Sequence, residues 1–174
     1  MTNIMKRVKS IEEYIVSFRR DLHENPELSG QEFKTQEKIM KELDKLGIPY
    51  RKAGNTSIIA ELEGGKPGKT IALRGDIDAL PIKEESGVDY TSKVPGVMHA
   101  CGHDAHAAML LGAAKILQGM KEDIKGNVRF FFQEGEETFS GAKKIIEAGG
   151  MEGVDACFGM HGMPSLEPGY VDIT

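Results

Sequence analysis

Apolar residues near the amino terminus recur at helical spacing. They stand three or four positions apart over residues 10–24, which predicts a helix with one apolar face: Ile11, Tyr14, Ile15, Phe18 and Leu22. Ser10 and Glu13 match a capping box at the start of this helix. The same spacing predicts a second helix over about residues 31–46, ended by Gly47.

Beyond residue 56 the pattern changes to short apolar runs separated by turn-forming residues, as in GGKPGK. The runs predict strands over residues 57–62, 70–73, 127–133 and 156–161, with helices over residues 105–119 and 141–148. A last apolar run covers residues 170–173. Because strands alternate with helices, we expect an α/β domain with a mostly parallel sheet flanked by helices.

Composition narrows the class of protein. The 174 residues are 40% hydrophobic and 28% charged, as is typical of a single globular domain. The net charge of −5, without a run of basic residues, argues against a nucleic-acid partner. The apolar stretches are too short to cross a membrane, and the amino terminus lacks a signal-peptide pattern. With two cysteines and no export signal, we expect free thiols and a cytoplasmic protein.

Side chains that bind metals stand at or near the ends of separate predicted elements. They are Cys101 and His103 in HACGHDAH, Glu137 in QEGEE, and His161 in FGMHG. In open α/β sheets, ligands bind beyond the carboxyl ends of the strands, so we expect these motifs to meet at one rim. A thiolate, imidazoles and a carboxylate together favour zinc or a similar divalent ion over calcium or magnesium.

Carboxylates beside these ligands are candidates for proton transfer and for support. Glu136 is expected to stay free next to Glu137 and to act as the general base on an activated water. Asp76 and Asp78 in RGDIDALP follow a predicted strand and are expected to orient the ligands and tune their basicity. The set is at least one ligand short of filling two metal sites. We therefore interpret the chain as the first part of a larger hydrolase.

The remaining histidines and the second cysteine have structural interpretations. His106 lies one helical turn after His103 and is expected to pack or hydrogen-bond near the site, as is His99. His23 is expected to cap backbone carbonyls at the end of the first helix. Cys157 lies within an apolar strand and is expected in the core.

Two other functions fit parts of the pattern. The first is a non-catalytic metal-binding or interaction fragment, because a partial site can hold an ion without turnover and an open sheet edge invites association. The second is a cysteine hydrolase that uses Cys101 with a nearby histidine. It is the weaker alternative, since a nucleophilic cysteine does not require Glu136, Glu137 and His161 around it.

Several longer strings resemble one family of enzymes. The strings are FRRDLHENPELSGQE, RGDIDALP, HACGHDAHAAMLLGAA, FFFQEGEE and MHGMP. In this order and spacing they resemble the dinuclear-metal amidohydrolases and carboxypeptidases, a group that includes hippurate hydrolase, N-acyl-amino-acid amidohydrolases and auxin-conjugate hydrolases. The resemblance runs over essentially the whole chain.

The resemblance implies an activity and roles for individual residues. Such enzymes cleave the amide bond of an N-acyl amino acid and release a carboxylic acid and a free amino acid. Cys101, His103, Glu137 and His161 match positions of metal ligands, with the thiolate as a candidate bridge between two ions. Glu136 matches the catalytic base and Asp78 a supporting carboxylate. The implied cofactors are two divalent ions, with zinc first and manganese, nickel or cobalt as alternatives.

The resemblance also implies a larger protein. Members of the family continue after the position of His161 with a lid domain, and their catalytic domain then resumes and supplies a last histidine ligand. We therefore expect residues 1–174 to be the amino-terminal portion of the catalytic domain, with the lid domain absent and with little activity alone. The lid often carries a dimer interface, so a homo-oligomer is expected for the whole protein.

Overall fold

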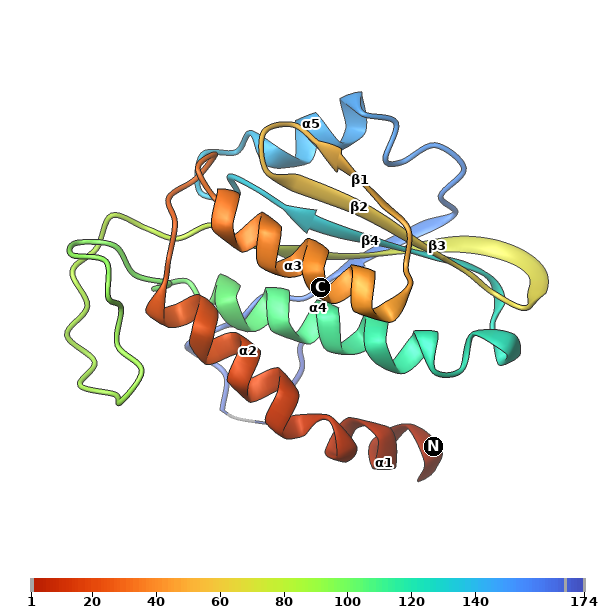
Figure 1. The fold of residues 1–174 in the computed structure, drawn as a ribbon, viewed down its shortest axis with the longest axis horizontal. Helices are drawn as coiled ribbons and strands as arrows, with labels where there is room; N and C mark the ends of the chain where they lie inside the picture. Colours follow the sequence, from red (N-terminus) through yellow and green to blue (C-terminus); the bar gives the residue numbers. More distant parts are fainter. Residues whose placement is uncertain (1, 168, 174) are drawn as a thin grey trace.

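The computed structural model describes residues 2–167 and 169–173. The helices are α1 (Thr2–Ser10), α2 (Glu12–Glu24), α3 (Phe33–Leu46), α4 (His103–Gln118), the short η1 (Lys121–Asp123) and α5 (Gly141–Glu147). The strands are β1 (Tyr50–Ala53), β2 (Ser57–Glu63), β3 (Lys66–Asp76), β4 (Lys125–Gln133) and β5 (Ala156–Gly159). Figure 1 shows them arranged as one sheet with helices on both faces.

The five strands form a mixed sheet in the order β1-β2-β4-β3-β5. The β1–β2 and β2–β4 pairs are antiparallel, whereas β3 runs parallel to both β4 and β5. The expectation of a mostly parallel sheet is therefore wrong. The mixed arrangement follows from the connections between the strands. Short turns after β1 and β2 reverse the direction of the chain, whereas two parallel strands need a long crossover connection. Only β3, β4 and β5 are separated by helices, and these three strands are parallel to one another.

Buried side chains alternate between the two faces of the sheet. In β4, Phe130 and Phe132 point to the core beneath α3 and α4, whereas Phe131 joins a smaller cluster that includes Ile145 of α5. This alternation follows from the two-residue period of a strand. In Figure 1, α3 and α4 accordingly cover one face, α5 lies on the other, and α2 packs against α4.

The amino-terminal helices differ from the expectation in their boundary. Ser10 is the last residue of α1, and its hydroxyl donates a hydrogen bond to the carbonyl oxygen of Arg7 at 2.7 Å. The predicted capping box is therefore wrong, and Ile11 precedes α2 without a side-chain cap. The predicted end of α3 is confirmed, since Gly47 follows it with a left-handed φ of 65° that glycine adopts without strain.

β1 is present although the sequence pattern did not predict it. The apolar run over residues 170–173 forms no strand in the described part of the chain. Among the helices of residues 2–167 and 169–173, none combines the length and apolar character that a membrane crossing requires.

The burial of Phe130 in the core leads to a first testable prediction. Phe130 is fully buried between the sheet and the helices, so Phe130→Ala is expected to lower the free energy of unfolding by about 3–5 kcal/mol. Phe139 is 91% exposed and provides a matched control, for which Phe139→Ala is expected to change stability by about 0.5 kcal/mol or less. Urea denaturation followed by circular dichroism measures both. Equal losses for the two variants would show that the assigned core is wrong.

Candidate metal centre

The candidate residues meet at the carboxyl ends of the three parallel strands. Asp76 is the last residue of β3, Glu136 and Glu137 follow β4, and His161 follows β5. His103 begins α4, whose first turn faces the same edge of the sheet. The structure thus brings together side chains from four separate segments, as expected for ligands at the strand ends of an α/β sheet.

One group of potential ligands contains Cys101, His103 and Glu137. One ligand atom from each lies within 4.8 Å of the others. The distance between His103 Nε2 and Glu137 Oε1 is 3.9 Å, and both atoms are buried without a hydrogen-bond partner among the described residues. The Nε2 atom of His161 lies 3.3 Å from Cys101 Sγ. These spacings fit atoms that each lie about 2.0–2.3 Å from a shared cation.

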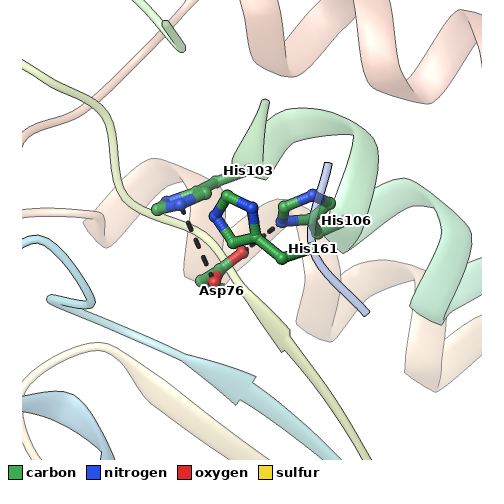
Figure 2. Close-up of side chains that lie close together, drawn as sticks. All are labelled: Asp76, His103, His106 and His161. Carbon is green, nitrogen blue, oxygen red and sulfur yellow. Dashed lines mark hydrogen bonds and ion pairs between the residues drawn. The ribbon is translucent and has the colours of Figure 1, made fainter. Parts of the chain in front are cut away.

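A second group contains Asp76, His103, His106 and His161, whose ligand atoms also lie within 4.8 Å of one another. Figure 2 shows the three imidazoles gathered around the carboxylate of Asp76. The rings of His106 and His161 have centroids 4.7 Å apart, and those of His103 and His161 are 5.6 Å apart. The two groups share His103 and therefore lie side by side. His103 offers a single free nitrogen, Nε2, and can bind one cation. Asp76 and His106 were not among the ligands expected from the sequence.

His106 bonds within the site, as expected. The backbone N–H of Gly162 donates to His106 Nε2 at 2.9 Å. Its Nδ1 therefore carries the proton and donates to Asp76 Oδ1 at 2.6 Å. Burial alone raises the pKa of Asp76, but the hydrogen bond from His106 and nearby positive charges lower it overall. Arg74 adds an ion pair with the same carboxylate, at 2.6 Å.

Asp78 orients His103 and the loop that carries Glu137. The Nδ1–H of His103 donates to the carbonyl oxygen and to Oδ1 of Asp78 at 2.9 and 3.0 Å. Its lone pair on Nε2 then faces the centre of the site, which is the tautomer that a metal ligand needs. Ser29 Oγ and the backbone N–H of Glu137 donate to Asp78 Oδ2 at 2.7 and 3.1 Å. Burial raises the pKa of Asp78, but these bonds outweigh burial and bring the pKa to about 2.

Glu136 lies at the rim of the site. Its Oε2 atom is 3.8 Å from His103 Nε2, and its side chain is 30% exposed. The adjacent Glu137 places its Oε1 atom at a similar distance, 3.9 Å, from the same nitrogen. Only the Glu137 oxygen is buried without a partner among the described residues and belongs to the group of potential ligands with Cys101. A partly exposed carboxylate beside buried ligand atoms has the placement that a proton carrier requires.

The proximity of Cys101 and His161 bears on the cysteine-hydrolase hypothesis. A distance of 3.3 Å between thiol and imidazole is within reach of proton transfer. However, burial and then the neighbouring carboxylate of Glu137 raise the pKa of Cys101 to about 11. A nucleophilic cysteine needs an electropositive environment that lowers its pKa, and the carboxylates around Cys101 create the opposite.

A buried network supports the loop that carries Glu136. The backbone N–H of Gly135 donates to Glu32 Oε1 at 3.0 Å, and Thr56 Oγ1 lies 2.5 Å from Glu32 Oε2. Glu134 forms an ion pair with Lys144 across the same interior. Neither Glu32 nor Glu134 was expected from the sequence, because an isolated glutamate carries no signal that it will be buried.

Two structural expectations from the sequence are wrong. His23 does not cap its helix, because its Nδ1 atom bonds Asp104 at 2.7 Å and its Nε2 atom contacts Glu84 at 3.1 Å. Cys157 is exposed and not in the core, because β5 is the edge strand of the sheet. His99 is buried near the site, and burial lowers its pKa to about 4.

A comparison with models of protein families shows the family of the chain. The model of a family described as Peptidase family M20/M25/M40 matches residues 72–174. The chain belongs to this family. The resemblance to amidohydrolases and carboxypeptidases is thereby confirmed.

Individual M20 relatives match nearly all of the chain. Thermostable carboxypeptidase 2 of Saccharolobus solfataricus is 51% identical over 158 residues, which cover 88% of this chain and 40% of that protein. An N-acyl-L-amino acid amidohydrolase of Geobacillus stearothermophilus is 45% identical over 172 residues, which cover 98% of this chain and 46% of that protein. One similar crystal structure is that of Bacillus subtilis YXEP protein, described as a dinuclear metal binding peptidase from the M20 family. The two sequences are 47% identical and the structures match with a TM-score of 0.88, over 91% of this chain and 45% of that chain. The chain thus spans less than half of each relative.

Proposed function

We propose that this chain carries the metal-binding part of an amidohydrolase that cleaves N-acyl amino acids into a carboxylic acid and a free amino acid. Support comes from the M20 relatives, one of which is named as an N-acyl-L-amino acid amidohydrolase. Further support comes from the side chains at the strand ends, whose chemistry suits hydrolysis of an amide. The proposed activity is that of the whole protein. Each relative is more than twice as long as its segment that matches this chain.

The observation that carries the proposal is the pair of buried atoms that face each other without a partner. His103 Nε2 and Glu137 Oε1 lie 3.9 Å apart, and the thiol of Cys101 completes the group. Leaving such atoms unpaired is costly unless something binds them, and the donor set of sulfur, nitrogen and oxygen suits zinc. Cys101, His103, Glu137 and His161 would hold two divalent ions, with Asp76 and His106 beside them.

Protein groups in this site have separable roles. When bound, divalent ions would act as a Lewis acid toward the amide carbonyl and would lower the pKa of water. Glu136 takes a proton from the attacking water and gives it to the nitrogen of the leaving amine. Asp78 keeps the proton of His103 on Nδ1, and Asp76 does the same for His106. These two aspartates therefore orient the imidazoles without touching the substrate.

Removal and return of metal test the proposal. The test uses the whole protein, because residues 1–174 are expected to have little activity alone. After chelator treatment it is expected to hydrolyse neither hippurate nor other N-acyl amino acids, and added zinc, manganese, cobalt or nickel is expected to restore the activity. Zinc at 100 times its dissociation constant is also expected to stabilise the fold by about 2.7 kcal/mol, measured as a rise in the thermal midpoint. Stabilisation without hydrolysis by any metal would favour a non-catalytic metal-binding protein. Activity that survives complete removal of metal would contradict the proposal.

A further inference from the structure

A pocket of about 450 Å³ lies beside the candidate metal centre. Its walls come from α2, from two parts of the loop between β3 and α4, and from residues 162–164. Cys101 and Gly102 line the side nearest the metal centre. A molecule in this pocket would therefore touch the loop that carries a candidate metal ligand.

The size and lining of the pocket fit a small organic group. Small-molecule sites typically measure about 300–1,000 Å³ and are mostly apolar with a few polar groups. Here the side chains of Val88, Met98 and Met163 and the ring of Tyr90 form apolar parts of the wall. We infer that the pocket accepts an apolar body larger than a methyl group.

The charged side chains in the wall are already paired. Arg19 Nε contacts Asp104 Oδ2 at 2.6 Å. Glu84 accepts hydrogen bonds from His23 Nε2 at 3.1 Å and from the backbone N–H of Ser92 at 2.5 Å. The negative charge of Glu84 disfavours a free carboxylate in the pocket, and Arg19 is held by its own partner. An uncharged group is therefore favoured over the carboxylate end of an amino acid.

His99 is a buried polar group of the wall without a partner among the described residues. Its side chain is 3% exposed, and neither ring nitrogen has a hydrogen-bond partner among the residues described. An imidazole carries at least one N–H in every protonation state. Buried polar groups in folded proteins are nearly always hydrogen-bonded, so this N–H is available to an acceptor on a bound molecule.

We propose that this pocket receives the acyl group of an N-acyl amino acid, with His99 donating a hydrogen bond to an acceptor on that group. The inference rests on the proposed function, because hydrolysis at the metal centre leaves the acyl group on one side of the broken bond and the amino acid on the other. Glu84 disfavours the charged amino acid, which leaves the acyl group as the occupant. An acetyl group fills little of about 450 Å³, so large acyl groups such as benzoyl are expected to be preferred.

A substitution that fills the pocket tests whether the acyl group binds there. Val88→Trp places an indole in the wall, and Ile82→Trp on the same loop, outside the pocket wall, is the matched control. The zinc-loaded natural protein and both variants are assayed on N-benzoyl and N-acetyl derivatives of the same amino acid. We expect Val88→Trp to lower the benzoyl-to-acetyl ratio of kcat/KM by about tenfold or more, and Ile82→Trp to leave it within about twofold. An unchanged ratio in Val88→Trp overturns the proposal.

The hydrogen bond of His99 is tested with matched acyl groups. The three isomeric pyridinecarbonyl groups resemble benzoyl in shape but carry an acceptor in the ring. We expect at least one isomer to be preferred over benzoyl, His99→Phe to abolish that preference, and His99→Gln, which keeps an N–H donor, to retain part of it. If no isomer is preferred, or if the preference survives in His99→Phe, the role of His99 is wrong. Circular dichroism verifies that both variants are folded.

Failure of the proposed function would give a different result. If the natural protein hydrolyses no N-acyl amino acid, the pocket is tested by titrating benzamide, an uncharged benzoyl compound, into the zinc-loaded protein in a calorimeter. We expect benzamide to bind the natural protein and Ile82→Trp alike, and Val88→Trp about tenfold more weakly. No binding to the natural protein, or equal binding to Val88→Trp, overturns the assignment of the pocket.

Discussion

Replacing Glu136 by glutamine is expected to lower kcat on an N-acyl amino acid by about 10²–10⁴-fold. The amide of glutamine has nearly the size of the carboxylate but cannot take a proton from water. Because Glu137 and not Glu136 belongs to the group of potential ligands with Cys101 and His103, the variant is expected to keep its metal. Steady-state kinetics and metal analysis by mass spectrometry measure the two effects on the same sample.

An exposed glutamate provides the control for this variant. Glu85 lies on the surface with its side chain 77% exposed, so Glu85→Gln is expected to leave both kcat and metal content unchanged. Hydrolysis by Glu136→Gln at the rate of the natural protein would refute the role assigned to Glu136. Loss of metal from Glu136→Gln would instead show that Glu136 is a ligand.

Substitution of a candidate ligand is expected to act on the metal itself. Glu137→Gln and His161→Ala should each weaken zinc binding on the order of 100-fold or more, since even residues behind the ligands contribute about 10–100-fold. Competition with a chromogenic chelator measures the affinity. Glu136→Gln, which has the same chemical change one residue earlier, is the matched control for Glu137→Gln.

The zinc affinities of these variants show which side chains are metal ligands. Tight zinc binding by Glu137→Gln with weak binding by Glu136→Gln would exchange the roles of the two glutamates. Tight binding by His161→Ala would remove His161 from the ligand set and leave the group of Cys101, His103 and Glu137. Loss of fold in any variant is recognised from circular dichroism before metal binding is compared.

Much of the fold was predictable because local patterns specify local structure. The apolar period of α3 and the glycine at its end predict a helix that stops at Leu46, as observed. The direction of the strands was not predictable from the alternation of elements. The pattern did not reveal β1, which pairs with β2 through a short turn, nor the antiparallel pairing of β2 with β4. Nor did the pattern predict α1, which ends at Ser10, just before α2 begins at Glu12.

The site was predictable in its motifs and less so in its contacts. Metal-binding side chains at strand ends could be expected to meet, since β3, β4 and β5 present their carboxyl ends on one edge. The bond between His106 and Asp76 could not, because it depends on how α4 lies over β3. Ser29 bonds Asp78 across a separation of 49 residues, and no local pattern encodes such a contact.

By itself, the sequence determined the class of fold, the types of donor atom and the family to which the chain belongs. Helical and strand periods, capping glycines and ligand motifs act within a few residues, so they can be read along the chain. The tertiary structure alone decided which strands pair, which carboxylates are buried and which imidazole stays unpartnered. These properties depend on distances between segments far apart in sequence, and the cost of burying a polar group depends on the neighbours that only the folded chain supplies.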